Sequence, residues 1–141
     1  MGFLSEHPLD VGALAAAVAG PGRGGTCTFL GAVRDHHAGR GVVELEYSAY
    51  GPMAEATIGA IVAEAERRWP VRVAAAHRLG RLAVGDAAVA VAAAGAHREE
   101  AFAACRFVIE ELKRRVPIWK RERFADGTEA WVDPTAVEAS R

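Results

Sequence analysis

Cysteine is scarce in this sequence, and neither sign of charge dominates. Only two cysteines occur among 141 residues, Cys27 and Cys105, and no CxxC pair is present. A disulfide framework and a cysteine-rich metal site are therefore disfavoured, and we expect a reducing compartment, the cytoplasm. The formal net charge is -1, which disfavours a protein that attracts nucleic acid or anionic membranes over its whole surface.

Long hydrophobic runs and common catalytic motifs are also missing. The uncharged stretch at residues 87–96 is about half of the roughly 20 residues that a transmembrane helix needs, so we expect a buried strand there. Glu6 and Asp10 interrupt the start, where a signal peptide would be apolar. No Walker loop, Rossmann glycine pattern or serine-triad elbow occurs, and the adjacent His36 and His37 lack further metal ligands. We expect neither metal nor cofactor.

The hydrophobic pattern predicts one domain over residues 1–141 that contains both helices and strands. Half of the residues, 51%, are hydrophobic and 25% are charged, an ordinary globular mixture. Apolar runs and alternation predict strands at 26–33, 43–50, 71–77, 87–94, 118–124 and 129–132. Helices are predicted at 11–19, between the Gly-Pro at 51–52 and the Trp-Pro at 69–70, and at 98–115; segments 34–41 and 78–86 are expected as loops, and 134–141 as a frayed tail.

Hairpin-linked strands favour a mixed α+β fold with the helices packed on one side of the sheet. Alternation in the strand at 43–50 places Val43 and Tyr47 on the buried face. In the helix at 98–115, a stripe at spacings of three and four is expected to face the core; it comprises Phe102, Cys105, Ile109, Leu112 and Val116. Cys105 is then a small buried hydrophobe rather than a nucleophile.

The strongest chemical feature is the segment 113–123, which has six basic residues and one acid and so a local charge of 6 - 1 = +5. Lys113 ends the predicted helix, Pro117 turns the chain, and Lys120 lies on the strand that follows, so the two amines are expected to converge at one corner. Repulsion and partial burial would then lower the pKa of at least one amine, which makes it usable as an acid or base. For Arg114 and Arg115 we favour a solvated helix end, with Glu110 as partner for Lys113 or Arg114.

Further cations stand at element ends. Arg34 follows the strand at 26–33, and His97 and Arg98 begin the second long helix, where the helix dipole favours an anion such as phosphate. Taken alone, His97 is more simply a capping or surface residue.

Several short segments together resemble a known family. They are GAVRDH at 31–36, LEY at 45–47, HRLG at 77–80, AHR at 96–98 and VPIWKRE at 116–122. Over about residues 26–132 the sequence closely resembles the large, catalytic subunit of molybdopterin synthase. The resemblance implies an α/β hammerhead fold with a largely antiparallel sheet and two long helices. It also implies a sulfurtransferase that makes the dithiolene of molybdopterin from cyclic pyranopterin monophosphate.

The resemblance also implies partners and roles. The sulfur donor is the C-terminal Gly-Gly thiocarboxylate of a small ubiquitin-like carrier, bound to a homodimer of large subunits to give a heterotetramer. The catalytic lysines correspond to Lys113 and Lys120. The substrate-binding positions correspond to Ala32, Val33, Arg34, His97, Arg98, Lys113, Lys120, Arg121 and Glu122, with the His-Arg pair supplied by the neighbouring subunit.

One alternative is a non-catalytic module that uses the basic segment 113–123 to hold RNA or another anionic partner. The absence of a wider basic stripe with interleaved aromatics disfavours RNA. Another is a relative that docks the carrier without catalysis, which the presence of both lysines and the His-Arg pair disfavours.

Overall fold

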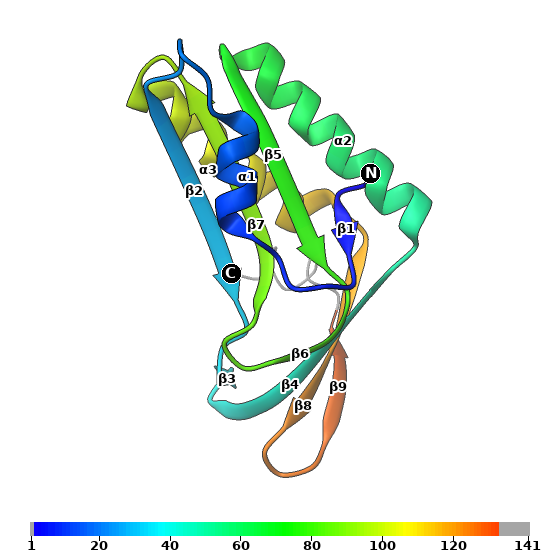
Figure 1. Ribbon diagram of the computed structural model, residues 1–141. Helices are drawn as coiled ribbons and strands as arrows, with labels where there is room; N and C mark the ends of the chain where they lie inside the picture. The colour runs from blue at the N-terminus through cyan, green and yellow to red at the C-terminus, as the bar shows by residue number, and fades with distance from the viewer. Residues whose placement is uncertain (1, 133–141) are drawn as a thin grey trace.

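The computed structural model describes residues 2–132. They form two β-sheets, and the second extends from one end of the first (Figure 1). The first sheet has four strands in the order β1-β5-β7-β2, of which only β1 and β5 pair in parallel. Its strands are β1 (Leu4–Ser5), β5 (Val71–Arg78), β7 (Ala87–Gly95) and β2 (Gly25–Ala32). The mixed, largely antiparallel α+β architecture is confirmed. The predicted tail, residues 134–141, lies outside the described residues.

Three helices cover this sheet on both faces, so the expectation that all helices pack on one side is wrong. Alternate residues of β7, among them Val91 and Ala93, pack in the main core with α2 (Gly51–Arg68) and α3 (Arg98–Arg115). The residues between them, Ala92 and Ala94, pack against α1 (Val11–Val18) on the other face. The reason is that β7 is apolar on both faces, a pattern typical of a strand covered from both sides.

A second sheet curls away from the first at one end (Figure 1). Its order is β3-β4-β8-β9, and β6 also pairs with β4, on the edge opposite β8. Its strands are β3 (His36–His37), β4 (Arg40–Ala49), β8 (Ile118–Phe124), β9 (Glu129–Val132) and β6 (Gly80–Ala83). Both segments expected as loops, 34–41 and 78–86, therefore contain short strands. Each was missed because it is only two or four residues long, too short to show a periodic pattern.

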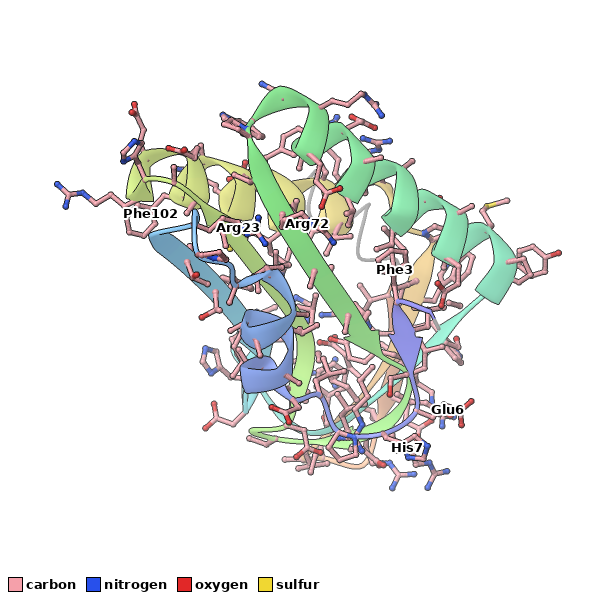
Figure 2. All side chains as sticks on the ribbon, turned by 45° about the horizontal axis from the view of Figure 1, so that its top comes forward. Phe3, Glu6, His7, Arg23, Arg72 and Phe102 are labelled. Carbon is pink, nitrogen blue, oxygen red and sulfur yellow. The ribbon has the colours of Figure 1, made fainter. Side chains whose placement is uncertain are left out.

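Two side chains expected in the core are exposed. A register shift between Val42 and Glu44 makes a bulge in β4, so Val42 is buried and Val43 is 47% exposed. On α3 the stripe predicts Cys105, Ile109, Leu112 and Val116 correctly, but Phe102 is 61% exposed; Figure 2 shows it at the N-terminal end of the helix. Burial raises the pKa of the Cys105 thiol to about 12, which keeps it protonated, as the hydrophobic interpretation requires.

The charges at the helix ends agree with the helix dipole. α3 has Glu99 and Glu100 in its first turn and Lys113, Arg114 and Arg115 in its last. Asp10 caps α1 by accepting a hydrogen bond from the Ala13 backbone N–H at 3.1 Å. None of the helices within residues 2–132 is sufficiently long and apolar to span a bilayer.

Candidate functional site

A pocket lies where the C-terminal end of α3 meets β8. Lys113, in the last turn of α3, and Lys120, on β8, both line it. Pro117 follows the helix, and the chain resumes as a strand at Ile118. The other walls of the pocket are largely apolar and include Ile58 and Ile109. The sequence contains fifteen arginines but only these two lysines, so this is where both lysine amines of the chain lie.

His77, at the end of β5, is a third polar group of this pocket. Its Nδ1 lies 2.8 Å from the carbonyl oxygen of Arg78, which can only accept, so Nδ1 carries a proton and donates it. Burial lowers the pKa of His77 to about 4, and the positive charge of Lys113 acts in the same direction. The ring is therefore neutral at neutral pH, and its proton is on Nδ1.

Tyr47, on β4, is the fourth polar group of the pocket. Its ring meets the His77 ring edge-on, with centroids 4.9 Å apart and an angle of 75°. Burial, and then the negative charge of Glu122, raise the pKa of Tyr47 to about 12, so the phenol keeps its proton. Neither ring was predicted from the sequence to have a role. The sequence did contain a signal: Tyr47 and His77 are polar residues on strands whose other inward-facing residues are apolar.

Glu122 lies behind Lys120 on the same face of β8, two residues further along, and is only 3% exposed. Its Oε2 is 3.8 Å from Lys120 Nζ, and its Oε1 is 2.7 Å from His37 Nδ1. The predicted site residues Lys113, Lys120 and Glu122 are thus grouped at one end of the molecule. The contact with His37 was not foreseen, because the two residues are 85 positions apart.

Arg121 occupies the opposite face of β8. Its guanidinium pairs with Glu46 on β4 and, at 3.3 Å, with Glu129 on β9, and it lies 5.6 Å from the Trp131 ring. The structure therefore separates the Arg121 side chain from those of Lys120 and Glu122. Alternation along a strand requires this for neighbouring residues.

The other arginines of the segment 113–123 also have acidic partners. Arg114 pairs with Glu111, Arg115 with Glu64 and Glu111, and Arg123 with Glu129. The expected pairing of Glu110 with Arg114 is wrong, since Arg114 pairs with Glu111 and Glu110 contacts Arg106 at 3.0 Å. The local charge of +5 is thus largely compensated by glutamates from α2, α3, β4 and β9. This disfavours an RNA-binding surface, which needs cations exposed along one face.

Ala32, Val33 and Arg34 lie at the end of β2, where the register with β7 shifts. Val33 is buried, and its backbone holds the β6–β7 turn through hydrogen bonds with Asp86 and Gly85, both 2.9 Å. Arg34 is exposed. Among the described residues, the wall of the lysine pocket includes the neighbouring β7 residues Ala88 and Val89 but none of these three.

His97 and Arg98 lie at the other end of α3, in a second hollow whose lining includes Gly24 and Gly25. His97 is the N-terminal capping residue of α3, yet its side chain makes no capping hydrogen bond. Fifteen residues of helix separate Arg98 from Lys113, a distance of about 22 Å at 1.5 Å per residue. One copy of the chain therefore does not bring the His-Arg pair to its own lysines.

Among residues 2–132, no group of three His, Cys, Asp or Glu side chains is arranged to hold a metal ion. His36 and His37 take different partners, since His36 Nδ1 contacts Asp35 at 2.8 Å and His37 contacts Glu122.

Comparison with known proteins identifies similar chains. Residues 4–115 match the model of a family described as MoaE protein. A relative from Mycobacterium tuberculosis, named molybdopterin synthase catalytic subunit 1, is 50% identical over 130 residues, which cover 92% of this chain and 88% of the relative.

Solved structures are similar as well. The crystal structure of molybdopterin synthase from Staphylococcus aureus superposes with a TM-score of 0.88 at 33% identity, covering 93% of this chain and 96% of that one. A complex described as subunits 1 and 2 of molybdopterin-converting factor from Helicobacter pylori gives a TM-score of 0.73 at 22% identity, covering 92% of this chain and 88% of that one. This second likeness concerns the fold alone.

Proposed function

Because the chain belongs to the MoaE family, we propose that its lysine pocket is the active site of a molybdopterin synthase catalytic subunit. The chain is a sulfurtransferase of molybdenum cofactor biosynthesis. The observation that carries the assignment of the site is that both lysines of the sequence line one largely apolar pocket together with a neutral imidazole and a protonated phenol.

The sulfur donor in this proposal is the C-terminal thiocarboxylate of a small ubiquitin-like carrier that ends in Gly-Gly. Two glycines without side chains make a thin tail, which suits a narrow apolar pocket. The thiocarboxylate is an anion, and an apolar wall strengthens its attraction to the ammonium groups of Lys113 and Lys120. His77 adds no positive charge of its own, since its pKa of about 4 leaves it neutral.

The acceptor is cyclic pyranopterin monophosphate, whose side chain gains two sulfur atoms to form the dithiolene while the cyclic phosphate opens. Each exchange of oxygen for sulfur requires protons to be moved. In this proposal Lys113 and Lys120 move them, and Tyr47 donates a hydrogen bond from a phenol that stays protonated. Glu122 balances the charge of Lys120 from behind the pocket.

The phosphate requires further cations. We assign this contact to Arg34, at the end of β2, with Ala32 and Val33 before it, and to His97 and Arg98 of a second copy. Arg121, on the opposite face of β8 from Lys120, stays a predicted substrate contact. A second copy is invoked because α3 separates the His-Arg pair from the lysines of its own chain by about 22 Å. The proposed assembly is a homodimer that binds two carriers.

We also propose a cytoplasmic location. Cys27 and Cys105 are both free thiols, as is usual in a reducing compartment.

The experiment that tests this function combines the purified chain with a thiocarboxylated carrier and the cyclic pterin, and measures molybdopterin formed. Lys120→Ala is expected to make almost no product, and Lys113→Ala much less than the unmodified chain, because each removes a positive charge from the reacting centre. Near-normal turnover by Lys120→Ala would contradict the assigned role.

Arg114→Ala provides the matched control. Arg114 neighbours Lys113 in sequence but is exposed and pairs with Glu111 outside the pocket. Its removal is expected to leave product formation close to that of the unmodified chain. An equal loss in Arg114→Ala and Lys113→Ala would indicate a general effect of charge on the helix end.

A further inference from the structure

Among the described residues, Glu122 is the one charged side chain that is buried. The groups around it show how the protein accommodates a buried carboxylate. A carboxylate removed from water requires compensation by charge and by hydrogen bonds. Three groups from three strands face it: His37 from β3, Tyr47 from β4 and Lys120 from β8. Glu122 thus connects the pocket to a histidine that has no part in the function proposed above.

The two oxygens of Glu122 are engaged differently. An ionised carboxylate only accepts hydrogen bonds, so His37 Nδ1 donates to Oε1 across 2.7 Å. Lys120 Nζ is 3.8 Å from Oε2, which is an ion-pair distance but too long for a hydrogen bond. The carboxylate is therefore held most closely on the side away from Lys120.

The hairpin that carries His37 is anchored to the rest of the second sheet. His37 pairs with Arg40 across a two-residue turn, in which Ala38 and Gly39 have φ of 53° and 79°. The Arg40 guanidinium lies 3.6 Å from the centre of the Phe124 ring and donates a hydrogen bond to Thr128 at the β8–β9 turn. A left-handed alanine is uncommon, so the surrounding contacts fix this turn and place the His37 ring.

We propose that His37 is a positioning residue for Lys120, and that it acts by holding the Glu122 carboxylate back from the lysine amine. The inference rests on the proposed function, because it concerns the same lysine. With Oε1 bound to the imidazole, Glu122 neutralises Lys120 from a distance without closing onto it. Without His37, the carboxylate turns to the ammonium, pairs more tightly and draws Nζ out of the pocket wall.

The low number of lysines makes a direct test practical. In protein labelled with nitrogen-15 at its lysine amines, only Lys113 and Lys120 give side-chain signals, and Lys113→Arg assigns them. A pH titration then gives the pKa of Lys120 without any reaction. In His37→Ala, closer pairing with Glu122 is expected to raise the pKa of Lys120 by about one unit.

The same variant is expected to turn over about tenfold more slowly, with an unchanged KM for the carrier, because a small displacement of a reacting group is costly. His37→Asn, whose side-chain amide can still donate to Glu122, should restore both values. His36→Ala is the matched control, since His36 is exposed and contacts Asp35 alone among the side chains described here. If His37→Ala does not fold, His37→Phe, which keeps a ring without a donor, replaces it with the same expected shifts.

The outcomes separate the two proposals. If Lys120→Ala retains turnover, the proposed function fails. If Lys120→Ala is inactive but His37→Ala leaves the pKa of Lys120 and the turnover unchanged, or lowers that pKa, only the role of His37 is overturned. An equal shift in His36→Ala also overturns it.

Discussion

Single residues set the charge of the pocket. His77 and Tyr47 are both titratable, yet burial keeps His77 neutral, with a pKa of about 4, and Tyr47 protonated, with a pKa of about 12. Their edge-on contact holds both rings in the wall. Neither ring therefore changes its charge between pH 5 and 9. The positive charge of the pocket comes from the two lysines.

The lowered pKa of His77 predicts how stability depends on pH. In the unfolded chain, His77 binds a proton once the pH falls below its ordinary pKa of 6.5. In the folded chain it binds a proton only near pH 4. Its burial therefore destabilises the fold progressively as the pH falls through this window. His77→Gln should reduce the loss of unfolding free energy between pH 7 and pH 5 by about 2 kcal/mol, measured by urea denaturation.

His36→Ala serves as the control for this pH effect, because His36 is exposed. Its pH dependence should match that of the unmodified chain. The same slope in His77→Gln as in the unmodified chain would contradict the burial of a neutral His77.

At the scale of elements, the contact of β2 with the start of α3 is tight. A Cβ atom on Gly25 would lie 2.9 Å from the Arg98 backbone nitrogen and 3.0 Å from the His97 carbonyl carbon. Backbone atoms cannot turn aside as a side chain can. The glycine therefore allows the helix N-terminus to rest directly on the strand.

Gly25→Ala is expected to destabilise the fold by about 1–3 kcal/mol, because the clash forces α3 away from β2. It should also impair turnover if His97 and Arg98 bind substrate. Thermal unfolding measures the first effect and the sulfur-transfer assay the second.

Gly22→Ala is the comparison, because a Cβ there meets nothing within 4 Å. A stability close to that of the unmodified chain is expected. Equal losses in both variants would show that the contact at Gly25 is not the cause.

The sequence predicted the long elements well and the short ones poorly. α3 has a continuous periodic signal and β7 a continuous apolar run, whereas β6 has four residues and is a strand only because it pairs with β4. Val43 was misplaced because a bulge reverses the alternation, and a bulge depends on the partner strand. Lys113 and Lys120 could be predicted to meet because a single proline turn joins them. His37 and Glu122 could not, because their contact requires the whole second sheet.

At the scale of the whole molecule, α3 separates two groups of predicted site residues. Lys113 and Lys120 lie at its C-terminal end, and His97 and Arg98 at its N-terminal end. Two such copies, side by side and in opposite directions, would place each pair opposite the other. The exposed Phe102, one turn into α3, offers apolar surface near the His-Arg end, and the exposed Leu30 lies toward the opposite end of the edge strand β2, where it pairs with Ala90.

Complementation tests this arrangement. Lys120→Ala and Arg98→Ala, each impaired alone, are mixed under conditions that allow subunits to exchange. If each site takes residues from two copies, about a quarter of the original activity should return, because half of the random dimers are mixed and each has one intact site of two. No recovery despite demonstrated exchange would indicate that each copy uses its own residues.

The distribution of lysine makes this chain suited to chemical footprinting. An amine-directed reagent finds its side-chain targets only at Lys113 and Lys120, both in the wall of one pocket. The extent of their modification, read by mass spectrometry of the intact chain, therefore reports whether the pocket is occupied. Candidate ligands can be ranked by the protection they give, before any of them is shown to react.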